Sequence, residues 1–193
     1  LEGDVIHLKN IVTELSDNYT KQTLANVFQV PDKMPEYVFD DFIMSPNGFF
    51  SKELDRILKN NPDADEDDIA FEFEDWVDIN WRLKVLKLNL SDFTKDNQKT
   101  MIQRKFGDAN PDGIPDEERR VEYQRKKARE LKPGKNLSVI MLNKGNEYRL
   151  LEGWHRTMAI LSLGDNGEKD PTKWKPIKIK AYVGTGSSVK RVW

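Results

Sequence analysis

The sequence predicts an α+β protein in which a mainly helical, acidic N-terminal part precedes a domain of alternating strands and helices. In the first 80 residues, apolar side chains recur at three- and four-residue spacing, as in amphipathic helices. Later they alternate with polar residues in short runs, as in half-buried strands. Residues 1–80 hold 6 Lys+Arg against 19 Asp+Glu, whereas residues 81–193 hold 25 against 14. We expect an N-terminal extension over 1–80, a domain over 81–184 and a tail over 185–193.

The composition limits the classes of protein to consider. The chain of 193 residues has 37% hydrophobic residues, enough for a core, and no cysteine, which excludes disulfides and thiol chemistry. No apolar run approaches the length of a membrane span, and no signal-peptide pattern opens the chain. We therefore expect a cytoplasmic protein without a membrane partner.

Helical spacing is clear in two segments of the N-terminal extension. It covers residues 4–30, with an interruption near Asp17, and residues 49–60, where Phe50 and Leu54 share one side. Between them, residues 37–44 form a short aromatic-rich element, which we interpret as part of a core. The extension is thus predicted to be a small helical unit.

The end of the extension is strongly acidic. Residues 63–78 contain nine Asp and Glu without one Lys or Arg, interleaved with apolar side chains. This pattern predicts an amphipathic segment with an acidic outer face, and a solvated face is the favoured interpretation. The alternatives are a mimic of nucleic acid and a clamp onto the basic half of the chain.

A predicted strand over residues 82–90 opens the second domain, with a turn or helix start at 91–93. Residues 94–118 are polar. The segment 108–119 resembles a calcium loop with a central Gly113, but Arg119 occupies the position of the bidentate Glu. We therefore favour an ordinary loop there and assign no metal site.

A basic helix is predicted over residues 116–132, ended by Pro133-Gly134. It is either a solvated helix or a helix that faces the phosphates of DNA or RNA. For the second alternative, the interface within residues 119–135 consists of Arg119, Arg120, Arg125, Lys126, Lys127 and Arg129.

The remaining elements are short. A strand over 137–142 leads through a hairpin turn at 143–146 to a second strand over 147–152, and a last strand covers 176–183. Between the second and the last strand, a helix is predicted to begin just after Gly153, where a sharp turn needs a positive φ or a close backbone approach.

The turn at Gly153 is the most informative stretch. A helix start presents backbone N–H groups and a positive dipole end, and here His155, Arg156 and Thr157 add further donors. This combination favours an anion, of which phosphate is the commonest in biology. The alternative is an ordinary strand-turn-helix corner whose Arg and His face solvent.

The order of elements from residue 82 onward resembles the ParB/sulfiredoxin-like superfamily. The matching pieces are residues 82–93, 137–142, 148–151 and the block from Glu152 through Arg156 and Ala159 to Gly164. The resemblance implies a small mixed sheet with packed helices. It also implies a nucleotide, ATP or CTP with Mg²⁺, held by Gly153, Trp154, His155, Arg156 and Thr157, with Glu152 and Asp92 as catalytic carboxylates.

One activity found in this superfamily, that of the sulfiredoxins, is excluded because the chain has no cysteine. Sulfiredoxins need a Cys directly after the glycine, where this chain has Trp154. The resemblance leaves a nucleoside triphosphate-binding protein, with phosphoryl transfer, hydrolysis or a ParB-like nuclease activity as its enzymatic forms. The alternative is a non-enzymatic nucleic-acid-associated module that uses residues 119–135 and is inhibited by residues 63–78. A third possibility is an adaptor with a silent nucleotide site.

Overall fold

The fold is α+β, as the sequence predicts. The computed structural model describes residues 20–45, 48–106, 126, 129, 138–168 and 170–193, without the side chains of 103–106. The chain divides into two compact units, Leu1–Asp78 and Ile79–Trp193. The part of the first predicted helix over residues 4–19 lies outside the described residues.

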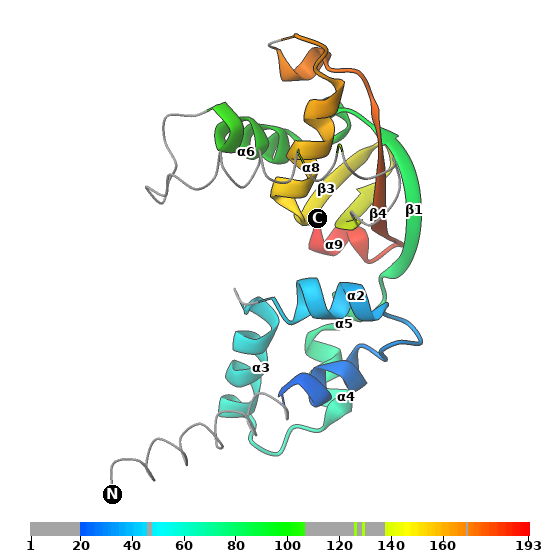
Figure 1. Cartoon of the computed structure of the whole chain (residues 1–193). Helices are drawn as coiled ribbons and strands as arrows, with labels where there is room; N and C mark the ends of the chain where they lie inside the picture. The colour runs from blue at the N-terminus through cyan, green and yellow to red at the C-terminus, as the bar shows by residue number, and fades with distance from the viewer. Residues whose placement is uncertain (1–19, 46–47, 107–125, 127–128, 130–137, 169) are drawn as a thin grey trace, which may run out of the picture. The chain divides into compact units, whose positions relative to one another are not determined.

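The described part of the first unit is helical (Figure 1). Residues 20–27 are helical and are followed by α2 (Glu36–Val38), the π-helical turn η1 (Phe39–Ile43), α3 (Phe49–Asn60), α4 (Glu66–Glu72) and α5 (Glu74–Val77). The predicted helix over 49–60 is confirmed by α3. The aromatic segment contributes to the core as expected, because Phe39 and Ile43 are buried.

An aromatic cluster forms the centre of this unit. The buried ring of Phe50 lies 5.6 Å from the ring centroids of Phe28 and Phe73 and 5.4 Å from those of Phe42 and Trp76. Three of these pairs are edge-to-face and the fourth is tilted, and aromatic rings prefer such arrangements to face-to-face stacking. The cluster therefore joins the first described helix, η1, α3 and the acidic segment into one core.

The acidic segment is helical because its carboxylates cap its own backbone. Asp65 accepts a hydrogen bond of 3.0 Å from the N–H of Asp68, and the Asp68 carboxylate accepts the N–H of Asp65 at 3.4 Å. Glu66 and Asp67 lie in the first turn of α4, where negative charge interacts favourably with the helix dipole. Part of the acidic run therefore has a structural role.

The second unit is built on one mixed sheet. Its strands are β1 (Asn80–Leu88), β2 (Ser138–Lys144), β3 (Glu147–Glu152) and β4 (Ile177–Thr185), in the order β1-β4-β2-β3. The β2–β3 hairpin and the β1–β4 pair are antiparallel, and β2 and β4 are parallel. The strand predictions are confirmed to within a few residues.

Two helices pack together on one face of this sheet, α6 (Lys95–Phe106) and α8 (Trp154–Leu161). Side chains alternate between the two faces of β4. The core beneath α6 and α8 contains Ile179, Ala181 and Val183, whereas the opposite face carries Lys178 and Lys180. The remaining short elements are η2 (Leu90–Asp92), η3 (Ser162–Gly164), η4 (Pro171–Lys173) and α9 (Val189–Val192).

Helix α6 occupies residues for which the sequence predicted only a polar segment. Its polar side chains attach it to the sheet: the Asn97 amide oxygen accepts the N–H of Leu150 at 2.6 Å, and the Gln98 amide donates to the Phe93 carbonyl at 2.6 Å. Both side chains are buried, so each bond contributes about 1 kcal/mol. Helix α6 therefore packs on the sheet through these two hydrogen bonds and the buried side chain of Met101. Because the segment has few apolar residues, its sequence did not indicate a helix.

The C-terminal residues are not the tail expected over 185–193. Strand β4 extends to Thr185, and α9 follows with Ser188 and Val189 buried. The Arg149 guanidinium donates a hydrogen bond of 2.7 Å to the carbonyl of Val192, which attaches α9 to β3. The segment was expected to be a tail, but the buried Val189 and the hydrogen bond from Arg149 hold it against the rest of the second unit.

Candidate functional site

Gly153 forms the turn between β3 and α8, for both of the reasons expected from the sequence. Its φ is +89°, in the left-handed region that side chains rarely adopt. A Cβ at this position would lie 2.8 Å from Cγ1 of Val139 on the neighbouring β2. The turn therefore brings bare backbone close to β2.

Helix α8 begins at this turn without a side-chain cap. Its first backbone hydrogen bond runs from the N–H of Thr157 to the carbonyl of Gly153 at 2.8 Å. The N–H groups of Trp154, His155 and Arg156 precede that bond and give the helix start its partial positive charge. The helix start that the sequence predicts to attract an anion is thus present.

The Arg156 side chain is held beside the turn. Its Nη1 donates a hydrogen bond of 3.0 Å to the carbonyl of Ser138, at the start of β2. A guanidinium remains charged at all physiological pH values. Its positive charge is therefore fixed close to the helix start.

Two other residues of the predicted phosphate site have structural roles. The Thr157 hydroxyl is completely buried and donates to the Gly153 carbonyl at 2.9 Å, so it is not the extra ligand donor expected from the sequence. Trp154 is half-buried and packs against the core of the unit. His155 is half-buried in the first turn of α8.

The two carboxylates predicted to be catalytic are not brought together. Glu152 ends β3 beside Gly153, but Asp92 lies in η2, and the next residue, Phe93, bridges to Tyr148 at the start of β3. Tyr148 and Glu152 are about 13 Å apart along the strand, at a rise of about 3.3 Å per residue. Asp92 is therefore distant from the turn.

The Asp92 carboxylate has a local role instead. It accepts the backbone N–H of Asn89 at 2.7 Å and so completes the cap of η2. Burial raises the pKa of Tyr148, and the nearby charge of Asp92 adds to the effect. The cap of η2 is therefore a sufficient structural role for the Asp92 carboxylate.

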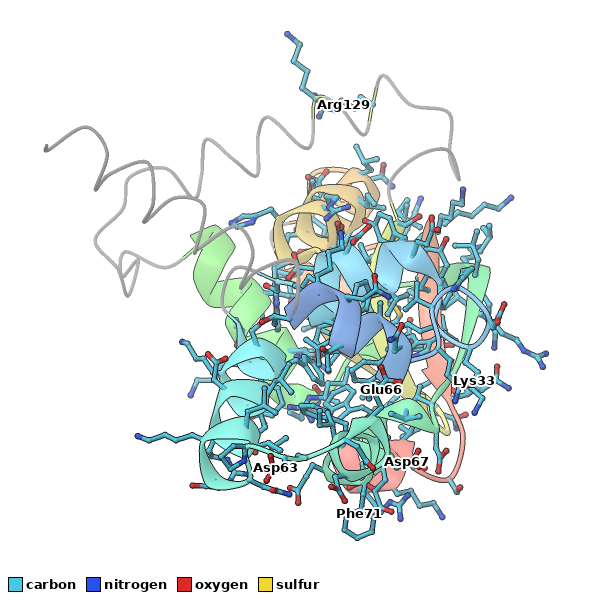
Figure 2. All side chains as sticks on the ribbon, turned by 90° about the horizontal axis from the view of Figure 1, so that it is seen from below. Lys33, Asp63, Glu66, Asp67, Phe71 and Arg129 are labelled. Atoms are coloured by element: carbon cyan, nitrogen blue, oxygen red, sulfur yellow. The ribbon has the colours of Figure 1, made fainter. Side chains whose placement is uncertain are left out.

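The predicted basic interface lies mostly outside the described residues. Of its members, Lys126 and Arg129 are described and exposed (Figure 2 labels Arg129), whereas Arg119, Arg120, Arg125 and Lys127 are not described. The loop over 108–119, weighed as a calcium site, is also outside. Within the described ranges, no group of three or more His, Asp or Glu side chains is arranged to hold a metal ion.

A second basic surface was missed in the sequence. Strands β1 and β4 pair along their whole length and together carry five cations and no carboxylate: Arg82, Lys84, Lys87, Lys178 and Lys180. The absence of acidic residues in each run was visible, but the pairing of two segments so distant in the chain was not. We define these two strands as the basic ribbon.

Comparisons with protein-family models, with curated proteins and with solved structures found no match to this chain. Among the described residues, no helix is both long enough and apolar enough to cross a membrane.

Proposed function

We propose that this chain binds the phosphate groups of a nucleoside triphosphate, ATP or CTP, at the turn from Gly153 to Arg156. One observation carries the proposal: α8 begins, without a side-chain cap, at a glycine with φ +89°, and Arg156 is held beside it. Backbone N–H groups and a fixed guanidinium at one helix start are well suited to phosphate.

The resemblance of residues 152–156 to the ParB/sulfiredoxin-like superfamily supports the same ligand. The order of elements in the second unit and its mixed sheet are compatible with that fold. We therefore include membership of this superfamily in the proposal. Mg²⁺ would accompany the triphosphate, with Glu152 as the neighbouring carboxylate.

The proposal is limited to binding. Phosphoryl transfer and hydrolysis use carboxylates that hold Mg²⁺ and orient the nucleophile. Only Glu152 of the two predicted carboxylates lies at the turn, because Asp92 caps η2 at the other end of β3. We therefore assign no transfer, hydrolysis or nuclease step to the site.

Arg156→Ala is expected to weaken nucleotide affinity by tenfold to about 150-fold. The reason is the loss of a charge-assisted hydrogen bond to phosphate, worth about 1.5–3 kcal/mol. The measurement is isothermal titration of the full chain with ATP and with CTP, each with and without Mg²⁺.

Arg149→Ala provides a matched control. Arg149 also donates one guanidinium hydrogen bond to a backbone carbonyl, that of Val192, but it lies in β3 and not at the turn. Its removal should leave nucleotide affinity unchanged. An equal loss in both variants, or a wild-type chain that binds neither nucleotide, would contradict the proposal.

A further inference from the structure

The basic ribbon carries an ordered surface on the face of the sheet opposite the α6 and α8 core. In the β1–β4 register, Lys87 lies opposite Lys178, Val85 opposite Lys180, and Leu83 opposite Tyr182. Cross-strand partners share a face of the sheet. The ribbon face therefore combines three lysines at one end with an apolar and aromatic strip beside them.

This arrangement is unfavourable for the chain alone. Lys87 and Lys178 are direct cross-strand partners, and like charges in such pairs destabilise a sheet. In the described part of the chain, no ion pair is formed by Lys87, Lys178 or Lys180. A bound anion would remove this repulsion.

The apolar part of the ribbon face is exposed. Leu83 is 47% exposed and Val85 is 58% exposed. Apolar side chains that alternate with charged ones on a strand usually face a core, but these two face solvent. Tyr182 is half-buried between them and the rest of the sheet. The ligand that fits this face therefore has both negative charge and flat apolar surface.

The position of β1 at the edge of the sheet leaves one side of the ribbon without a neighbouring strand among the residues that the structure describes. β1 is the terminal strand in the order β1-β4-β2-β3 (Figure 1). A second copy of this chain is a poor occupant, because its own ribbon face would bring the same three lysines, Lys87, Lys178 and Lys180, and no carboxylate of these strands against them. An external anion is better matched.

We propose that the ribbon face binds single-stranded nucleic acid. The phosphates contact Lys87, Lys178 and Lys180, and unpaired bases lie on Tyr182, Leu83 and Val85. Base stacking on aromatic rings requires strands that are not paired, because a duplex hides the faces of its bases. This function goes beyond nucleotide binding at Gly153 and uses different residues.

The test uses the full chain and a labelled single-stranded oligonucleotide of about 20 residues, longer than a single-strand binding site usually needs. Fluorescence anisotropy measures its affinity across a series of salt concentrations. The test variant is Lys87→Gln/Lys178→Gln/Lys180→Gln. The control is Lys33→Gln/Lys52→Gln/Lys59→Gln, which removes the same charge from exposed lysines of the first unit.

Each lysine that neutralises a phosphate contributes about 0.7 to the slope of log affinity against log salt. The ribbon variant should therefore lose about 2 from this slope and bind at least about tenfold more weakly at low salt. The control variant and Arg156→Ala should keep the wild-type slope. Circular dichroism of each variant serves as the control for folding.

Four results would overturn the proposal. The first is a wild-type chain that does not bind the oligonucleotide. The second is an equal loss of affinity in the ribbon and control variants. The third is equal affinity for a duplex of the same sequence. The fourth is displacement of the oligonucleotide by polyglutamate at matched charge, which would assign the face to an acidic polypeptide.

Discussion

Phe50→Ala is expected to lower the free energy of unfolding by about 3–5 kcal/mol. Phe50 is 1% exposed, and its ring contacts those of Phe28, Phe42, Phe73 and Trp76. Truncation removes the apolar group and leaves a cavity that the surrounding rings cannot fill completely. The measurement is chemical denaturation followed by circular dichroism and tryptophan fluorescence.

The neighbouring residue supplies the control for this prediction. Phe49 is 61% exposed and contacts Phe50 at a ring-centroid distance of 5.0 Å. Phe49→Ala should change the free energy of unfolding by no more than about 0.5–1 kcal/mol. Similar losses for both variants would show that the aromatic cluster is not centred on Phe50.

Gly153→Ala is expected to lower the free energy of unfolding by about 2–5 kcal/mol. An alanine at φ +89° pays about 1–2 kcal/mol for the left-handed conformation. Its Cβ, 2.8 Å from Cγ1 of Val139, adds about 1–3 kcal/mol of overpacking. Thermal and chemical denaturation of the variant measure the sum.

Gly145→Ala separates these two contributions. Gly145 in the β2–β3 turn also has a positive φ, +67°, but no atom lies within 4 Å of a Cβ built on it. Its substitution should cost only the backbone part, about 1–2 kcal/mol. If Gly153→Ala were no more damaging than Gly145→Ala, the close approach to Val139 would be unimportant.

Local patterns in the sequence predicted the local structure well. The alternation in β1 and β4, the spacing of Phe50 and Leu54 in α3, and the turn at Gly153 each depend on residues close together in the chain. Such features follow from side-chain periodicity and backbone freedom. The α+β class and the strand-turn-helix corner at Gly153 were therefore predictable.

Features that depend on distant residues were not predictable. Placing β4 between β1 and β2 creates the basic ribbon and requires pairing between segments far apart in sequence. The direction of β3 separates Asp92 from Glu152, and Asn97 turns a polar stretch into a docked helix. Likewise, only the folded turn shows that the Thr157 hydroxyl is already bonded to Gly153.

The most direct test of the proposed function is an NMR titration of the isotope-labelled full chain with ATP and with CTP in the presence of Mg²⁺. The proposal predicts saturable shifts that are largest at the backbone N–H groups of Trp154, His155 and Arg156. Absence of saturable shifts, or shifts confined to the basic ribbon, would contradict phosphate binding at the Gly153 turn.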